Sequence, residues 1–90
     1  MMTGDFSERV IKLSSETERE KMKDFLQRQG LSMDKDLEYS VALMENDRIV
    51  AAGSFSGRVL KCIAVDDEYK GTGLSARVIS HLVNEQYRRG

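Results

Sequence analysis

The stretch that decides the fold runs from Val59 to Ser75 and reads VLKCIAVDDEYKGTGLS. Its first seven residues, 59–65, are almost continuously apolar, which is typical of a strand buried on both faces. We therefore expect this segment to be the central strand of a sheet. A glycine loop follows, and beyond it apolar residues recur every three or four positions, which predicts an amphipathic helix over residues 74–88.

The rest of the chain supplies the other elements of one small domain. Ser15 and Glu18 have the spacing of a capping box, in which each side chain satisfies the other residue's backbone N–H, and Gly30 is suited to end the helix that begins there. The remaining predicted elements are a strand at 9–13, that helix at 16–29, and a hairpin of strands at 39–44 and 48–55. The predicted order is β-α-β-β-β-α.

Length and composition set limits on function. The chain has 90 residues, 40% of them hydrophobic, so we expect a single domain over residues 1–90. Its formal net charge of -1 offers no basic field and argues against nucleic-acid binding. One Cys and one His exclude an internal disulfide and a metal cluster built from these residue types. With no signal peptide and no apolar span, we expect a cytoplasmic protein without a membrane partner.

The glycine loop is the candidate binding site. Phosphate recognition requires backbone N–H groups that converge near a helix N-terminus, and glycines allow an anion to approach the chain closely. Gly71 and Gly73 provide that access, and Lys70 and Arg77 add positive charge. The free N–H groups are expected from Gly73, Ser75, Ala76 and Arg77.

Other interpretations of this loop are weighed against phosphate binding. Residues 71–76 match the dinucleotide pattern G-x-G-x-x-A, but the strands before the loop form a hairpin and five residues separate the last strand from the first glycine. A Rossmann unit therefore does not fit. No Walker A sequence occurs in the chain. A plain strand-to-helix turn that binds nothing remains the alternative.

The segment from Ile63 to Ser75 resembles the cofactor motif of the GNAT acyltransferase superfamily. The family pattern of Gln or Arg, two residues, Gly, one residue, and Gly or Ala maps onto Lys70, Gly73 and Ser75, so both end positions depart from it. The resemblance implies an α/β (α+β) fold with a central mixed, mostly antiparallel sheet flanked by helices, here without its C-terminal elements. It also implies that acetyl-CoA or CoA binds with its pantetheine arm along one strand. The implied cofactor-binding residues are Ile63, Val65, Lys70, Gly71, Thr72, Gly73, Ser75, Ala76 and Arg77.

A narrower resemblance is to the N-terminal GNAT-like domain of the citrate lyase ligase family. The segments 59–65 and 71–75, with Leu31 to Asp34 upstream, carry it. It implies a fragment of a longer ligase that acetylates the prosthetic group of the citrate lyase acyl carrier protein, with ATP used only by a domain absent from this chain. The alternative is a degenerate GNAT-like module that binds a partner protein without cofactor, or a homodimer formed through an exposed edge of 59–65.

No catalytic residue is assigned from the sequence. Cys62 is expected to be an inert thiol in a buried strand, and His81 a surface or partly packed residue of the last helix. The carboxylates that follow the last strand, Asp66, Asp67 and Glu68, are expected to be mostly solvated. In the GNAT family a Tyr on a later helix often protonates the leaving thiolate, and that region is absent here.

Overall fold

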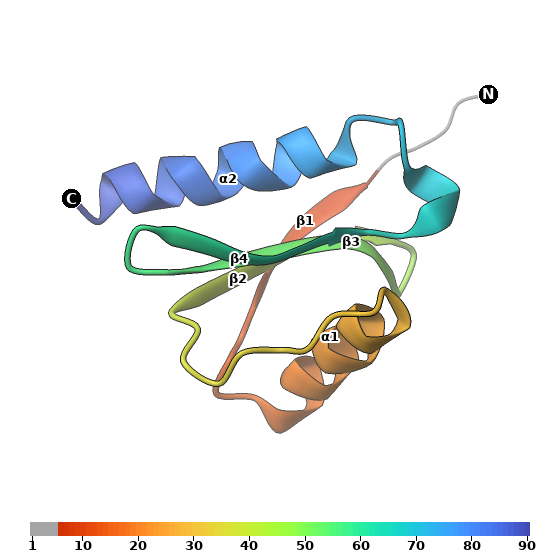
Figure 1. Ribbon diagram of the computed structural model, residues 1–90, viewed down its shortest axis with the longest axis horizontal. Coiled ribbons are helices and arrows are strands. Elements are labelled where there is room, and N and C mark those ends of the chain that lie inside the picture. The colour runs from red at the N-terminus through yellow and green to blue at the C-terminus, as the bar shows by residue number, and fades with distance from the viewer. Residues whose placement is uncertain (1–5) are drawn as a thin grey trace.

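The fold is a four-stranded sheet with one helix against each face (Figure 1). It is described here for residues 6–90 from a computed structural model. The elements are β1 (Ser7–Ile11), α1 (Glu16–Arg28), β2 (Tyr39–Glu45), β3 (Arg48–Ser56), β4 (Val59–Val65), the 3-10 helix η1 (Asp67–Tyr69) and α2 (Leu74–Arg88). The predicted α+β order is confirmed, and each predicted helix ends within one residue of its observed bounds.

The strands follow one another across the sheet in chain order, β1-β2-β3-β4, and every pairing among residues 6–90 is antiparallel. Asn46 has a positive φ of 58° in the tight turn between β2 and β3, as the predicted hairpin requires. β1 lies two residues earlier than predicted. The chain leaves the strand at Lys12, whose carbonyl accepts a turn hydrogen bond from the Ser15 N–H at 2.9 Å.

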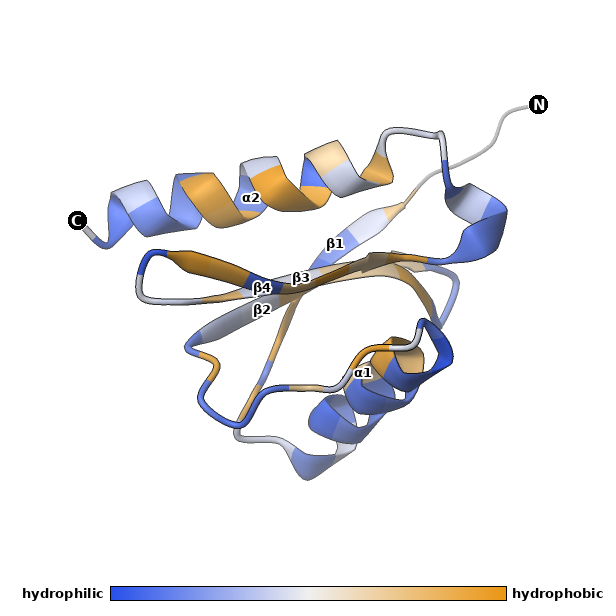
Figure 2. Cartoon of the chain, viewed as in Figure 1, coloured by the Kyte–Doolittle hydropathy of each residue, from blue (hydrophilic) through white to orange (hydrophobic). Residues whose placement is uncertain are grey.

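Two apolar clusters fill the spaces between the sheet and its helices. Met22, Phe25 and Leu26 of α1 cover one face, and Leu74, Val78 and Leu82 of α2 cover the other. Figure 2 shows that the strands are apolar in the middle of the sheet, whereas α1 is hydrophilic over much of its surface. Burial on both faces explains why β2 and β3 are apolar over most of their length.

The expectation that residues 59–65 form the central strand is wrong for the described part of the chain. β4 lies at the edge of the sheet, and most of its residues are only half-buried. The continuously buried strands are β2 and β3. An apolar run therefore identified a strand that packs on both helices but gave no information about its neighbours. Cys62 is accordingly half-buried, not a fully buried core thiol.

A β-bulge interrupts the pairing of β4 with β3. Ala52 pairs with Ala64 and Ser54 with Lys61, so Cys62 and Ile63 together lie opposite the single residue Gly53. Cys62 adopts a positive φ of 56° there. A Cβ on Gly53 would lie 2.5 Å from Val78 Cγ1, so the glycine allows α2 to lie directly against the bulged strands.

Candidate functional site

The N-terminus of α2 has no side-chain cap. Gly73 occupies the N-cap position with a φ of 84°, and its carbonyl accepts the first helical hydrogen bond from the Arg77 N–H at 3.3 Å. The four preceding N–H groups, from Gly73 to Ala76, therefore have no partner in the helix. The Arg77 N–H, expected to be free, is engaged in the helix instead.

The loop before α2 is open above both glycines. Gly71 and Gly73 each have a φ of 84°, and a Cβ built on either would meet no atom within 4 Å. Their conformation, and not crowding by neighbours, explains why glycine is needed at both positions. The positive end of the α2 dipole thus faces open space.

The start of the loop is fixed by its own polar groups. The Asp66 carboxylate accepts from the Glu68 N–H at 2.9 Å and pairs with Arg48 at 3.0 Å. The Glu68 N–H and then Arg48 lower the pKa of Asp66. We expected a solvated carboxylate at this position. Asp66 is instead the N-cap of η1. The Thr72 hydroxyl donates to the Tyr69 carbonyl, so its side chain is used inside the loop and is not directed to a ligand.

A groove of about 260 Å³ joins this loop to the C-terminal half of β4. It is lined by Ile63, Ala64, Val65, Tyr69, Lys70, Gly71, Gly73, Leu74 and Ser75. Six of the nine residues implied by the GNAT resemblance thus lie around one hollow. The other three, Thr72, Ala76 and Arg77, do not line it.

The outer edge of β4 presents unpaired backbone groups to this groove. The Asp66 N–H donates to the Val50 carbonyl at 2.8 Å across the sheet, and hydrogen-bonded pairs alternate in antiparallel strands. Ala64 is therefore the next residue bonded to β3, and the N–H and C=O of Val65 point away from the sheet. An extended ligand can bind such groups as an added strand does.

The two cations expected at the loop already have partners in the fold. Lys70 Nζ lies 2.9 Å from Asp67 Oδ1, and Arg77 lies 3.4 Å from Glu8 Oε2. The Lys70 side chain is 67% exposed, and surface pairs of this kind contribute only about 0 to 1 kcal/mol. Lys70 can therefore exchange its partner for an anionic ligand at small cost.

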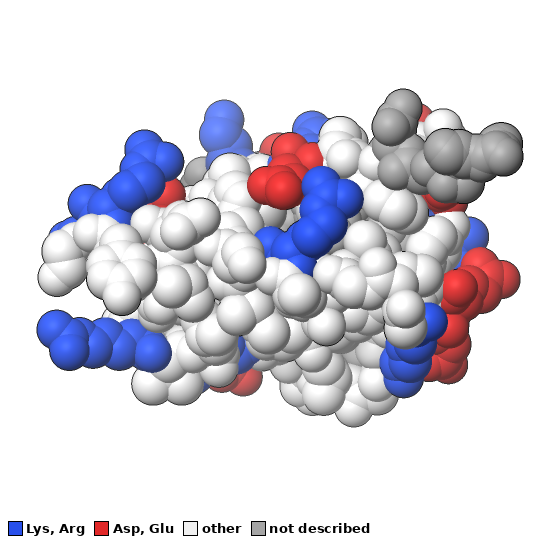
Figure 3. Space-filling model, turned by 90° about the horizontal axis from the view of Figure 1, so that it is seen from above, with Lys and Arg blue, Asp and Glu red and all other residues white. Residues whose placement is uncertain are grey.

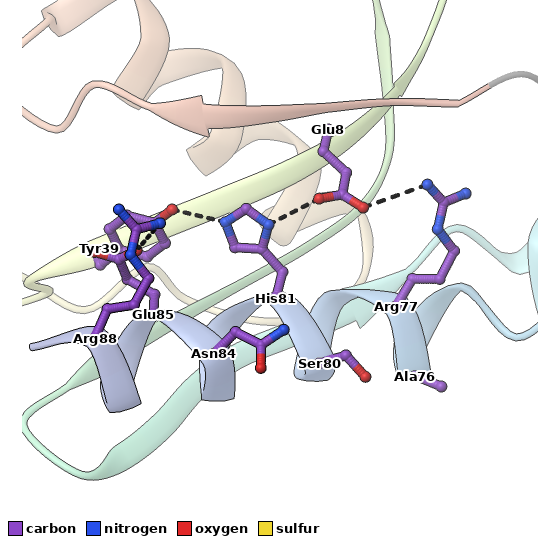
Figure 4. A pocket seen from close by; sticks show the side chains of 9 residues that line it. All are labelled: Glu8, Tyr39, Ala76, Arg77, Ser80, His81, Asn84, Glu85 and Arg88. Atoms are coloured by element: carbon purple, nitrogen blue, oxygen red, sulfur yellow. Dashed lines mark hydrogen bonds and ion pairs between the residues drawn. The ribbon is translucent and has the colours of Figure 1, made fainter.

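A second hollow, of about 500 Å³, lies on the other side of α2 and contains residues that the sequence did not point to (Figure 4). Ala76 and Arg77 line it together with Glu8, Tyr39 and His81. The His81 ring is held by Tyr39 and Glu8 from two different strands. These residues are 42 and 73 positions away from His81 in the chain, so no local spacing could have revealed them.

Two other features are absent from residues 6–90. No group of three or more His, Cys, Asp and Glu side chains is placed to hold a metal ion there. No helix in that range combines the length and apolar character needed to cross a membrane.

Comparison with known proteins points to one kind of enzyme. The chain is similar to the citrate (pro-3S)-lyase ligases of Klebsiella pneumoniae, 35% identical over 91% of this chain, and of Haemophilus influenzae, 33% identical over 79%. The ligase of Escherichia coli is 28% identical over 88% of this chain. The chain spans only 22 to 24% of the length of these relatives. It matches no model of a protein family and no solved structure.

Proposed function

We propose that this chain is an acyl-CoA-binding domain of the GNAT type and forms part of a protein related to citrate lyase ligase. The observation that carries the proposal is the groove in which the free edge of β4 meets the uncapped N-terminus of α2. The ligase relatives support the second part, because three of them are 28 to 35% identical to this chain over 79 to 91% of its length.

Binding uses the two halves of the groove differently. The CoA pyrophosphate accepts from the N–H groups of Gly73, Ser75 and Ala76 at the positive end of α2, and Lys70 moves from Asp67 to the phosphate. The pantetheine arm extends along the outer edge of β4 and pairs with Val65 and, near the bulge, Ile63. Arg77 contributes through its charge only after it leaves Glu8.

The proposed parent reaction is acetylation of the prosthetic group on the citrate lyase acyl carrier protein, in the cytoplasm. The name of the relatives describes a ligase that acts on citrate lyase. In this proposal ATP chemistry belongs to parts of the longer protein outside these 90 residues, and this domain recognises the acyl-CoA or the thiol-bearing arm.

The direct test is calorimetric titration of the chain with acetyl-CoA, CoA and pantetheine. We expect acetyl-CoA and CoA to bind in the submillimolar range and pantetheine, which lacks the pyrophosphate, to bind at least tenfold more weakly. A folded sample that binds neither CoA species at millimolar concentration contradicts the proposal.

Three glycine variants locate the site. Gly73→Asp places a carboxylate against the pyrophosphate, whereas Gly73→Ala adds no charge and is strained at least as much by the positive φ, which Asp tolerates better than Ala. Gly30→Asp adds the same carboxylate at another open glycine with a positive φ, 81°, far along the chain from the loop. We expect only Gly73→Asp to abolish CoA binding. Equal affinity in Gly73→Asp and Gly73→Ala refutes the site.

The second candidate function is a protein-interaction module without cofactor. The same free edge of β4 favours it, as does the uncharged surface that extends over much of the α2 side of the molecule (Figure 3). Ile79 and Tyr87 of α2 are 37% and 81% exposed. Light scattering distinguishes a homodimer paired through β4 from a monomer, and a partner that binds equally well with and without saturating CoA favours this function.

A further inference from the structure

Three side chains from three elements form a continuous hydrogen-bonded chain in the second hollow (Figure 4). Tyr39 of β2 places its hydroxyl 2.7 Å from His81 Nε2 on α2. His81 Nδ1 lies 2.8 Å from Glu8 Oε1 on β1. In an activated nucleophile, a hydroxyl is bonded to a base and a third group orients that base. Here the hydroxyl, the imidazole and the carboxylate stand in that order.

The protonation states follow from the bonding partners. An ionised carboxylate only accepts hydrogen bonds, so Nδ1 of His81 donates to Glu8, and in the neutral imidazole Nε2 is then free to accept from the Tyr39 hydroxyl. The hydrogen bond from His81 is the main cause that lowers the pKa of Glu8, and Arg77 at 3.4 Å adds to it. Glu8 therefore stays ionised and fixes the imidazole in the tautomer that can take a proton from Tyr39.

The phenol ring of Tyr39 contacts two other rings and one guanidinium group. It stacks on Phe55 and on His81, with centroid distances of 5.2 and 5.8 Å, and the Arg89 guanidinium lies 5.1 Å from its centroid. Burial, followed by the nearby Glu85, raises the pKa of Tyr39. The hydroxyl thus remains neutral at rest, and His81 Nε2 is the base within hydrogen-bond distance of it.

The space in front of the hydroxyl suits a small uncharged reactant. Its two lining cations are each matched by a carboxylate, Arg77 by Glu8 and Arg88 by Glu85 at 3.5 Å. The hollow therefore has no strong field of one sign.

We propose that Tyr39, His81 and Glu8 form a second reactive site, separate from the CoA groove, at which the Tyr39 hydroxyl accepts a small acyl group from an activated ester or thioester. Tyr39 Oη forms a bond to the acyl carbon while His81 Nε2 takes the phenolic proton. The bond from the acyl carbon to the leaving oxygen or sulfur breaks, and the leaving group departs with the electron pair and receives the proton from His81. The products are a Tyr39 ester and the protonated leaving group, and Glu8 positions the imidazole throughout.

The test treats the chain with p-nitrophenyl acetate after Cys62→Ser has removed the free thiol. Release of nitrophenol is followed by absorbance, and peptide mass spectrometry locates the acetyl group. Tyr87 is the internal control, because it is 81% exposed and the one histidine of the chain is bonded to Tyr39. We expect Tyr39 to be acetylated about 100-fold faster than Tyr87, the size of a general-base contribution.

Three variants separate chemistry from a merely structural role of the network, which also ties β1 to α2. Tyr39→Phe should remove the fast phase, His81→Gln should reduce the Tyr39 to Tyr87 rate ratio about 100-fold, and Glu8→Gln should reduce it less. Circular dichroism and thermal unfolding monitor folding in each variant. The proposal is overturned if Tyr39 reacts no faster than Tyr87, if the acetyl group resides on His81, or if His81→Gln lowers the melting temperature but leaves the rate ratio unchanged.

Discussion

The two helices of this domain begin in opposite ways. At α1, the Ser15 hydroxyl accepts from the Glu18 N–H at 3.4 Å, and Glu16 and Glu18 place negative charge in the first turn. At α2, Gly73 supplies no side-chain cap and the first turn contains no acidic residue. α1 thus gives two of its four N-terminal N–H groups, those of Ser15 and Glu18, an acceptor within the chain, whereas the four at the start of α2 have no partner in the helix.

The difference shows what holds each helix in position. A glycine N-cap provides no side-chain acceptor, which costs only a few tenths of a kcal/mol relative to Ser, so the position of α2 is decided by its other contacts. Those contacts are its buried residues and the close approach at Gly53. Packing therefore orients an N-terminus that no side chain caps.

The largest effect is expected from Gly53→Ala, which tests the packing of α2. A Gly to Ala change in a compatible site stabilises by about 0.4 to 1 kcal/mol. Here the new Cβ would lie 2.5 Å from Val78 Cγ1, and overpacking of this kind costs about 1 to 3 kcal/mol. We expect net destabilisation in urea unfolding, partly recovered by Val78→Ala in the same chain. No recovery in the double variant would show that another contact is responsible.

A smaller effect is expected from removing the cap of α1. Ser15→Ala should lower the free energy of unfolding by about 1 kcal/mol, because the Glu18 N–H loses its acceptor. The neighbouring Ser14 is exposed and provides the matched control, so Ser14→Ala should leave the urea midpoint nearly unchanged. Equal midpoints for the two variants would mean that the α1 cap contributes nothing to stability.

A third substitution makes the start of α2 resemble that of α1. Ala76→Glu adds an acid to an exposed position in the first turn, which should stabilise the fold by about 0.3 to 1 kcal/mol through the helix dipole. In the same variant the CoA affinity should fall, since the carboxylate competes for the N–H groups. Ala76→Gln controls for side-chain size. Tighter CoA binding by the Glu variant would contradict the proposed phosphate site.

The smallest effect is a difference in how stability depends on pH, between the segment before α2 and the cap of α1. The pKa of Asp66 is lowered in the folded chain, so its contribution to stability is present at neutral pH and is lost as the pH falls through that lowered value. The Ser15 cap does not titrate. Asp66→Asn should therefore reduce the loss of stability on acidification, measured by urea unfolding at a series of pH values, whereas Ser15→Ala should leave the slope with pH unchanged.

The order of elements was predictable because it is encoded in local patterns. The spacing of Ser15 and Glu18 located the start of α1, although Glu18 Oε1 accepts from the Lys12 N–H at 3.0 Å and not from Ser15 as a capping box implies. Gly71 and Gly73 located the loop before α2. The edge position of β4 was not predictable, because an apolar run reports burial by the helices and not which strands lie beside it.

The candidate site was predictable in part for the same reason. Residues contiguous in the chain, such as Lys70, Gly71 and Gly73, lie around one groove with Ile63 and Val65. The direction of the Arg77 side chain was not predictable, because it depends on Glu8, which is 69 positions away. The network of Tyr39 and His81 was missed entirely, since it exists only once β1, β2 and α2 have assembled.

The bulge at Cys62 and Ile63 also determines how the open edge of the sheet behaves in a concentrated solution. A straight strand from another chain would lose its register where two residues of β4 oppose one of β3, and Lys61 places a charge beside that point. Long intermolecular pairing is therefore interrupted after a few residues. The domain can keep backbone groups unpaired for a short extended ligand without offering a template for aggregation.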